Sequence, residues 1–131
     1  MVVKGAVWGG LMATRAATIG VRGVVTDGRC RDLGELREKS FPVFAANISC
    51  HGSGGFAVPS TIGEPVVLNG VTVQSGSIVI ADMNGVVVIP LDRLADVMAE
   101  CERAKPIEEA CMRDLEAGKP LAETFKLHRG K

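Results

Sequence analysis

The glycine pair Gly9-Gly10 constrains the fold of this chain more than any other feature. Apolar and small residues recur at helical spacing from Gly10 to Ile19, and Gly20 stands where the end of a helix favours glycine. The β-branched run Gly23 to Thr26 predicts a buried strand that ends in an Asp27-Gly28 turn. The glycine pair therefore opens a short helix that a strand follows directly.

A second helix and a second strand are expected after that turn. Asp32 with Glu35 three residues later has the form of a capping box, which predicts a helix from Asp32 to about Lys39. The segment Pro42 to Ile48 predicts the next strand. His51 to Gly55 is too rich in glycine for regular structure, so we expect a flexible or tightly turned loop.

The second half of the chain predicts a series of hairpins and then helices. Pro90 ends the sheet, and Asp92 to Ala104 has the apolar spacing of an amphipathic helix. Pro106 should break this helix or start the next one over Ile107 to Ala117, and the last segment, to His128, should also be helical. The predicted hairpin strands are Glu64–Leu68, Val71–Val73, Ser77–Ala81 and Val86–Ile89.

Composition limits the class of protein. At 131 residues the chain fits one domain, residues 1–131, in which residues 91–131 form a helical C-terminal extension. Only five residues are aromatic, so the core must consist of aliphatic side chains, which favours a sheet-rich α/β interior. The net charge is zero and no stripe of Lys and Arg occurs, which argues against a nucleic-acid partner.

Cysteine usage and hydropathy point to a cytoplasmic protein. The four cysteines form no C-x-x-C pair, and the N-terminus has no secretory signal pattern, so reduced thiols are expected. They have no metal-ligand spacing and are interpreted as small apolar residues. No apolar run approaches the roughly 18 residues that a membrane span requires.

Two short segments could bind a ligand. A helix N-terminus attracts anions, and glycines at Gly9 and Gly10 let a carboxylate approach the backbone, although the pair could equally serve a tight turn. Arg31 offers a fork of donors for a carboxylate or keto oxygen, and Asp32 offers the hard oxygen that Mg²⁺ or Mn²⁺ prefers. The alternative is that Asp32 caps its helix and Arg31 is a surface charge. His51 is either an acid/base group or, more simply, a surface histidine.

Three separated segments, in order, closely resemble the RraA-like family, which comprises regulators of ribonuclease E activity and divalent-metal 4-hydroxy-4-methyl-2-oxoglutarate aldolases. The resemblance runs from about Gly5 to the tail, and the spacing between Gly10 and Arg31-Asp32 fits the family signature. The segments are Ala6–Ala16, Gly23–Asp32 and Asp82–Pro90.

The resemblance implies a fold, an assembly and residue roles. The implied fold is a β/β/α swivelling domain, like a phosphohistidine domain, assembled into homotrimers or hexamers with active sites between subunits. Gly9, Gly10, Leu11 and Met12 match the segment whose backbone amides hold the substrate carboxylate. Arg31 matches the substrate-binding arginine, and Asp32 matches the ligand of the divalent metal. An acidic residue in Glu108 to Glu116 is a candidate to reach a neighbouring subunit's site.

The sequence departs from the family pattern in two ways. Gly10 stands where many members have an acidic residue that supports the water shell of the metal, a substitution that fungal-type relatives with Trp-Gly-Gly-Leu-Met share. Members usually have a further N-terminal portion, whereas Met1 here lies just upstream of the site, as in a truncated form or partial gene product.

The functional expectation is a class II pyruvate aldolase. With Mg²⁺ or Mn²⁺ on Asp32, the site would cleave 4-hydroxy-4-methyl-2-oxoglutarate to pyruvate and would decarboxylate oxaloacetate, with Arg31 stabilising the enolate. The sequence does not indicate a buried, activated lysine, so a Schiff-base mechanism is not expected. The alternatives are a non-catalytic regulator that binds RNA-decay enzymes, and an inactive fragment.

Overall fold

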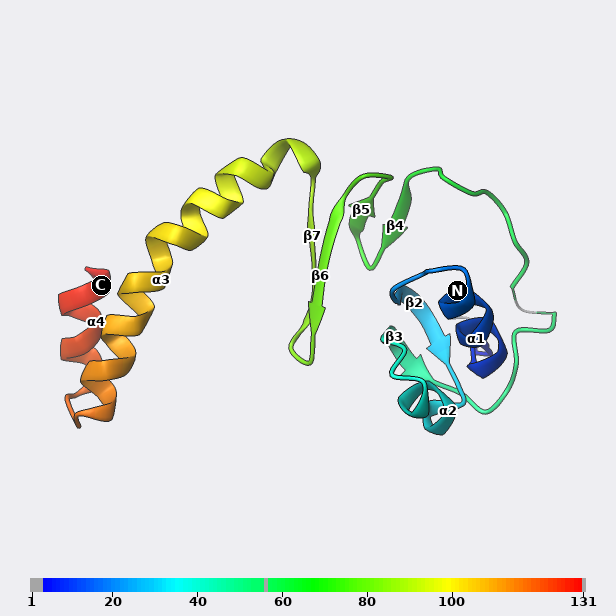
Figure 1. The fold of residues 1–131 in the computed structure, drawn as a ribbon, viewed down its shortest axis with the longest axis horizontal. Coiled ribbons are helices and arrows are strands. Elements are labelled where there is room, and N and C mark those ends of the chain that lie inside the picture. Colours follow the sequence, from blue (N-terminus) through cyan, green and yellow to red (C-terminus); the bar gives the residue numbers. More distant parts are fainter. Residues whose placement is uncertain (1–3, 56, 131) are drawn as a thin grey trace. The chain divides into compact units, whose positions relative to one another are not determined.

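The computed structural model describes residues 4–55 and 57–130, which form two compact units (Figure 1). The first unit ends at Val88 and the second begins at Ile89. Each unit is described by itself. The boundary lies close to residue 91, where we expected the helical extension to begin, and the assignment of the whole chain to one domain stays a prediction.

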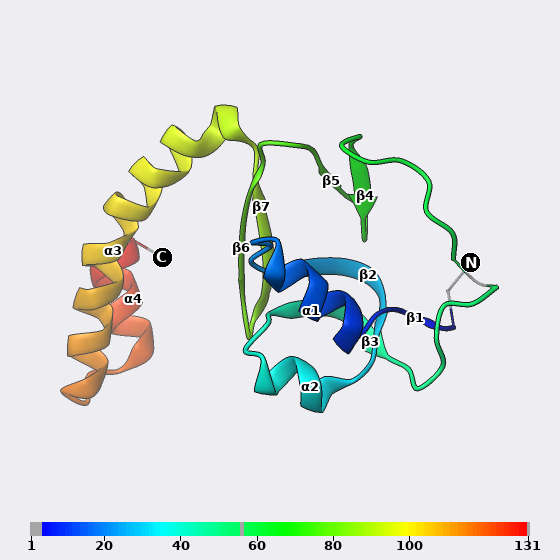
Figure 2. The same ribbon diagram turned by 45° about the vertical axis from the view of Figure 1, so that its right-hand side comes forward.

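A three-stranded parallel sheet with two helices organises the first unit (Figure 2). The strands are adjacent in the order β1-β2-β3, and each consecutive pair is joined through a helix, as parallel neighbours require. The elements are β1 (Ala6–Trp8), α1 (Gly10–Thr18), β2 (Val24–Cys30), α2 (Leu33–Glu38) and β3 (Val43–Ile48). The structure is therefore α/β, as predicted, and the expected end of α1 before a left-handed Gly20 is confirmed.

The core of this unit lies between the two helices and one face of the sheet. Ala13 and Ala16 of α1 and Leu36 of α2 are buried together with Phe41. Trp8 stacks on Phe41 with ring centroids 6.1 Å apart. Small alanines let α1 approach closely, so a few aliphatic and aromatic side chains suffice to fix both helices on the sheet.

Truncation of Leu36 should destabilise the first unit strongly. Leu36 is 5% exposed, and Leu36→Ala removes buried methyl groups and leaves a cavity, so the free energy of unfolding should fall by about 2–5 kcal/mol. Urea unfolding followed by fluorescence of Trp8 measures this change. Val58→Ala is the matched control, because Val58 is 85% exposed and its truncation should change the free energy by less than about 0.5 kcal/mol.

The expected turn at Asp27-Gly28 is wrong, because β2 continues through it to Cys30. The register with β3 shifts between Thr26 and Arg29, so the two residues form an irregularity inside the strand. A Cβ on Gly28 would lie 2.7 Å from the Cγ2 atom of Val7. Glycine is needed here because β1 packs tightly against this point, and the extra residue carries the strand on toward Arg31.

The predicted hairpins are present. β4 (Val66–Leu68) pairs antiparallel with β5 (Val71–Val73), and β6 (Ile78–Asp82) pairs with β7 (Gly85–Ile89). Asn69 and Gly70 both have positive φ, as the two-residue turn requires. An apolar cavity of about 630 Å³ is lined by these hairpins and by β2 and β3, through residues such as Val25, Phe44, Val71 and Val86.

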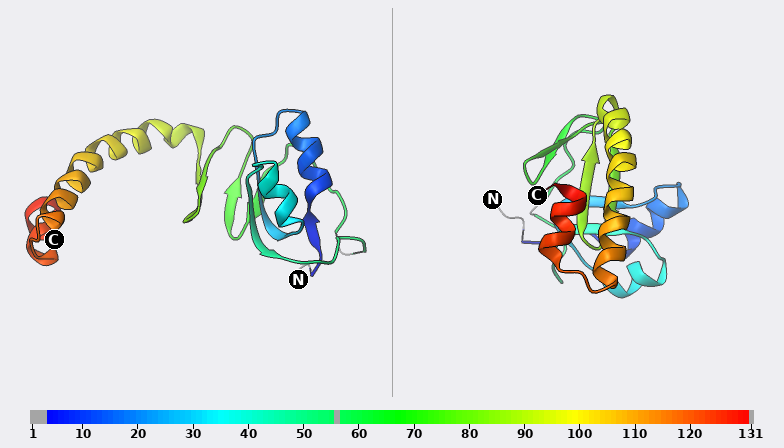
Figure 3. Two further views of the ribbon diagram at one scale, coloured as in Figure 1. Left: turned by 60° about the horizontal axis from the view of Figure 1, so that its bottom comes forward. Right: turned by 90° about the vertical axis from the view of Figure 1, so that its left-hand side faces the viewer.

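The second unit is a helical hairpin (Figure 3). After the 3₁₀ turn Leu91–Arg93, α3 runs from Leu94 to Glu116, and α4 (Leu121–Arg129) lies alongside its later part. The expected break at Pro106 is wrong, because the proline lies inside α3. Proline removes one backbone hydrogen bond, and the residues beyond it are held by packing on α4, so the helix continues. In the described ranges, no helix combines the length and apolar character that a membrane crossing requires.

Polar contacts join the two helices of this hairpin. The Asp114 carboxylate accepts a hydrogen bond from Lys119 Nζ at 2.8 Å and lies 2.8 Å from His128 Nε2. Arg129 pairs with Glu108 and lies 4.1 Å from the ring centroid of Phe125. The hydrogen bond from Lys119, and then that from His128, hold the pKa of Asp114 below its ordinary value.

Acid should therefore weaken the hairpin through Asp114. A carboxyl group whose pKa is lower in the folded state contributes stability above its ordinary pKa, and this stability is lost as the pH falls through the lowered value. We expect amide hydrogen exchange in α4 to accelerate relative to that in β2 below about pH 4. Asp114→Asn should show faster exchange in α4 already at pH 7 and little further change in acid. Identical profiles for both proteins would contradict this assignment.

Candidate functional site

The predicted site residues meet where β1 and β2 end. Gly9 follows β1 and precedes α1, while Arg31 and Asp32 follow β2 and precede α2. The Gly10 N–H donates a hydrogen bond to Asp32 Oδ2 at 2.9 Å, and Arg31 Nε lies 3.5 Å from the same oxygen. The Arg31 and Asp32 side chains are 45% and 32% exposed. The carboxyl ends of parallel strands are the usual place for ligand sites in α/β sheets, and this arrangement leaves both groups open to a ligand.

Asp32 does not cap its own helix, so the predicted capping box with Glu35 is wrong. Asp32 occupies the N-cap position of α2 with φ of 60° and makes no side-chain cap hydrogen bond. Its carboxylate instead binds an amide in the first turn of α1, where N–H groups have no partner within the helix. A left-handed aspartate costs about 1–3 kcal/mol, and here it directs the carboxylate toward the glycine pair. The alternative role of Asp32, as a side-chain cap of its own helix, is therefore excluded.

The glycine pair serves close packing at the site. Gly9 has extended backbone angles, φ of −158° and ψ of −174°, which any residue can adopt. A Cβ on Gly9 would lie 2.6 Å from Asp32 Oδ2 and 3.1 Å from the Arg31 side chain. A larger residue would displace both charged groups, so the glycine is required by the site and not by the turn alone.

Glu35 also belongs to the candidate site, although its spacing from Asp32 predicted a helix-capping role. A Cβ built on Gly10 would clash with the Glu35 carboxylate, so this carboxylate lies directly beside Gly10. Glu35 reaches this place because it is one helical turn after Asp32 on α2. The same spacing that suggested a capping box could have indicated a second carboxylate beside Asp32. The space beside position 10, where the family resemblance implied an acidic side chain, is thus filled by an acidic side chain from α2.

Leu11 and Met12 lie in the first turn of α1, and these residues are 84% and 49% exposed. The first hydrogen bond within the helix runs from the Ala13 N–H to Gly9 O. The amides of Leu11 and Met12 precede this bond and belong to the turn whose N–H groups point out of the helix end. They are placed where an anion could accept their hydrogen bonds, and their role in binding stays a prediction.

The loop after β3 lies beside Arg31. His51 O accepts a hydrogen bond from the Ala6 N–H at 2.7 Å, and Gly52 forms a bridge with Ala6. A Cβ on Gly52 would lie 3.7 Å from Arg31 Nη1. Cys30, at the end of β2, is buried, and burial raises the pKa of its thiol, which fits the predicted role as a small apolar residue. The loops after all three parallel strands therefore meet near the Arg31 guanidinium.

Metal-binding capacity at this site rests on the two carboxylates. Among residues 4–55 and 57–130, no group of three or more His, Cys, Asp or Glu side chains is arranged to hold a metal ion. Mg²⁺ commonly binds to one or two protein carboxylates and completes its shell with water and substrate oxygens. Asp32 and Glu35, both against the glycine pair, fit that requirement.

Comparison with known proteins identifies the family. A sequence model described as RraA-like, Aldolase/RraA, matches residues 2–88, which include β1 to β6 and the candidate residues Gly9 to Met12, Arg31 and Asp32. The chain belongs to the RraA-like family. The resemblance seen in the three sequence segments is thereby confirmed, and the mixed α/β fold agrees with the structures of RraA-like proteins.

Relatives of this RraA-like chain have different names. An uncharacterised protein of Methanocaldococcus jannaschii is 38% identical over 93% of this chain and 58% of its own length. A Halalkalibacterium halodurans protein with the provisional name 4-hydroxy-4-methyl-2-oxoglutarate aldolase is 28% identical over 80% of this chain and 50% of its own. A crystal structure of Streptomyces coelicolor RraAS2, described as an unusual member of the RNase ES inhibitor RraA family, is also similar to this chain. Its TM-score is 0.73 and its sequence identity is 26%. The match covers 82% of this chain and 55% of the RraAS2 chain. The chain thus spans between 50% and 58% of the length of these relatives.

Proposed function

We propose that this chain provides a divalent-metal site that cleaves carbon–carbon bonds in 2-oxo acids, as a class II pyruvate aldolase with oxaloacetate decarboxylase activity. The observation that supports this most directly is the Asp32 carboxylate held at the N-terminus of α1 beside the Arg31 guanidinium. The provisional name of the Halalkalibacterium halodurans relative supports the same reaction class. Substrate, metal and assembly are parts of this proposal.

Asp32 is the proposed metal ligand, and Glu35, whose carboxylate lies beside Gly10, would accept hydrogen bonds from water molecules on a bound metal. A bound Mg²⁺ or Mn²⁺ supplies Lewis-acid polarisation of the keto oxygen. The hydrogen bond from the Gly10 N–H and the left-handed backbone of Asp32 fix its carboxylate before any ligand binds. This preorganisation reduces the reordering that binding would otherwise require.

The remaining residues bind and orient the substrate. The amides of Leu11 and Met12 donate hydrogen bonds to the carboxylate of the pyruvoyl group at the positive end of the α1 dipole. In the aldol cleavage a water molecule accepts the proton of the C4 hydroxyl, whose oxygen becomes the carbonyl of the leaving product, whereas in oxaloacetate C4 leaves as CO₂. In both reactions the bond between C3 and C4 breaks, its electron pair enters the C2–C3 bond, and negative charge develops on the keto oxygen. Arg31 stabilises that oxygen, because a guanidinium keeps its charge and donates along a fixed direction. A water molecule then donates the proton that C3 needs.

Pyruvate release is the test of this proposal. The purified protein should release pyruvate from 4-hydroxy-4-methyl-2-oxoglutarate and from oxaloacetate with Mg²⁺, and a chelator should abolish the release. Borohydride added with substrate should trap no adduct, because no lysine imine is involved. If folded protein releases no pyruvate above the rate with Mg²⁺ alone, the proposed activity is refuted.

A second candidate function is binding without catalysis. The likeness to RraAS2, a member of the RNase ES inhibitor RraA family, favours a regulator that covers a surface of an RNA-decay enzyme. Both candidates are compatible with a homotrimer or hexamer, which light scattering would test. Stoichiometric binding to a purified RNA-decay endoribonuclease, unaffected by Asp32→Ala, would favour the regulator. Metal-dependent turnover that requires Asp32 would favour the aldolase.

A further inference from the structure

A second cavity in the first unit has a basic lining. Its volume is about 650 Å³, and its lining includes Lys4, Arg29 and His51, three residues with nitrogen-bearing side chains. The described residues around it include no aspartate or glutamate. The full lining is Lys4, Arg29, Leu33, Ile48, Ser49, Cys50 and His51. Such a lining attracts anions and repels metal ions.

Arg29 is the residue that most requires a partner in this cavity. Its Nε atom is buried and has no hydrogen-bond partner among the residues that the structure describes. Neither Arg29 nor Lys4 takes part in any of the ion pairs found in that part of the chain. A guanidinium stays charged at every physiological pH, and the charge of Arg29 has no counter-ion among the described residues. An oxyanion in the cavity would supply that counter-ion.

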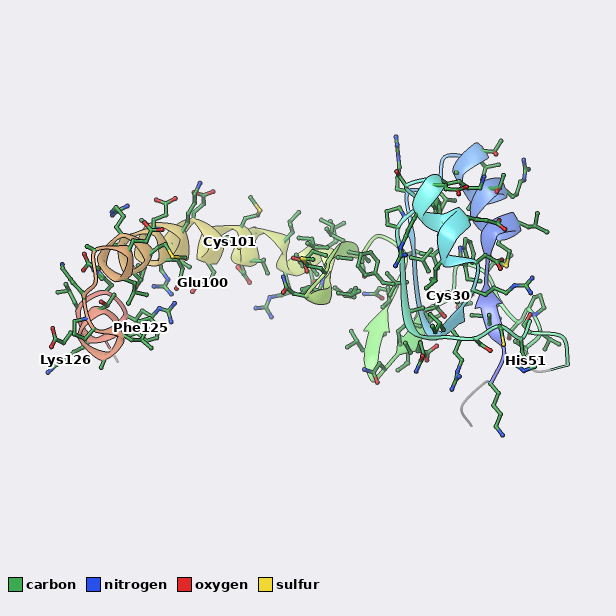
Figure 4. All side chains as sticks on the ribbon, turned by 90° about the horizontal axis from the view of Figure 1, so that it is seen from below. Cys30, His51, Glu100, Cys101, Phe125 and Lys126 are labelled. Carbon is green, nitrogen blue, oxygen red and sulfur yellow. The ribbon has the colours of Figure 1, made fainter. Side chains whose placement is uncertain are left out.

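The basic cavity adjoins the candidate active site along the chain and in space. Arg29 precedes Arg31 by two residues on the same strand end, and Leu33 directly follows Asp32. His51, labelled in Figure 4 on the loop after β3, directly precedes Gly52. Arg31 Nη1 lies 3.7 Å from the Cβ position of Gly52. A ligand bound at Arg31 could therefore extend toward the cavity.

We propose that Lys4, Arg29 and His51 form an oxyanion site that binds the second carboxylate of a dicarboxylic 2-oxo acid whose reacting end lies at Arg31 and Asp32. The identity of this ligand rests on the proposed function, whereas the anion site itself rests on the cavity and on Arg29. The site makes the chain selective for substrates with two carboxylates over pyruvate. Free phosphate shares the recognised chemistry and is the competing source.

Binding to the metal-free protein tests the anion site without any activity. Malonate and inorganic phosphate are titrated separately while NMR follows the imidazole signals of His51. Both the wild type and the control Arg22→Gln, an exposed arginine outside the cavity, should show a saturable shift with malonate. Arg29→Gln should weaken malonate binding about tenfold or more, the loss expected for one charge-assisted hydrogen bond. Lys4→Gln, at an exposed position, should weaken it less and cannot fail through loss of the core.

Kinetics with Mg²⁺ tests the substrate assignment. Arg29→Gln should raise the KM for oxaloacetate about tenfold with little change in kcat. At low oxaloacetate concentration the decarboxylation rate should therefore fall about tenfold. The rate of C3 proton exchange in pyruvate, which has only one carboxylate, should stay unchanged. Equal malonate binding by wild type and Arg29→Gln would overturn the anion site. A parallel loss of pyruvate exchange, or phosphate binding without any change in KM, would overturn the assignment to substrate. If the wild type is inactive but malonate binding depends on Arg29, the proposed function fails and the anion site stands.

Discussion

Replacing Asp32 with alanine should lower metal affinity by at least about a hundredfold and reduce pyruvate release in proportion at subsaturating Mg²⁺. The expected loss is large because Asp32 is the carboxylate that the fold holds against α1, through the 2.9 Å hydrogen bond from the Gly10 N–H. Titration with Mn²⁺ followed by electron paramagnetic resonance measures the affinity directly, and oxaloacetate decarboxylation measures the activity.

Asp27→Ala is the matched control for this substitution. Asp27 is an exposed residue of β2, the strand that precedes Asp32, but it lines the apolar cavity and lies outside the candidate site. Its removal should leave Mn²⁺ affinity and turnover within about twofold, an estimate that follows from the small effect of distant exposed charges. Unchanged turnover in Asp32→Ala, with circular dichroism like that of the wild type, would remove Asp32 from the mechanism.

Moving the second carboxylate from α2 to α1 should produce compensating effects. Glu35→Ala should weaken Mn²⁺ binding about 10–100-fold, because the carboxylate over Gly10 is lost. Gly10→Glu alone should lower thermal stability, since the new side chain meets the Glu35 carboxylate and adds a like charge. The double variant, Gly10→Glu with Glu35→Ala, should recover most of both losses, because one acidic side chain again occupies one space.

Mn²⁺ titration and thermal melting of all four proteins test this double-mutant cycle. Glu38→Ala, which removes another exposed acid of α2, is the control and should change neither quantity appreciably. A double variant that binds Mn²⁺ no better than Glu35→Ala would show that a carboxylate at position 10 cannot replace Glu35. The proposed role of Glu35 would then be wrong.

Local sequence patterns predicted most of the elements, and the failures have a common physical cause. The helix that begins at Gly10, the strand up to Ile48 and the Asn69-Gly70 hairpin depend on spacing and turn residues within a few positions, so they could be predicted. The strand through Gly28 and the uninterrupted helix at Pro106 depend on packing against Val7 and α4. Such packing is set by residues far away in the sequence.

The same distinction applies to the candidate site. The sequence pattern indicated that Gly9, Gly10, Arg31 and Asp32 should lie together, and the strand ends bring them together. It did not predict the direction of the Asp32 carboxylate, because its hydrogen-bond partner lies 22 residues away while an equally plausible local partner exists. Glu35 was predicted to form a capping box with Asp32 for the same reason. Roles that depend on a contact between two loops could be assigned only after the loops were placed.

The hydrogen bond from the Gly10 N–H to Asp32 Oδ2 makes the Gly10 amide proton a reporter of ligand binding at the site. Any ligand that draws electron density from Oδ2 of that aspartate weakens the acceptor, so the Gly10 amide resonance should move upfield when the carboxylate is engaged. A single peak in a nitrogen–proton spectrum would then report occupancy even for substrates that are never turned over.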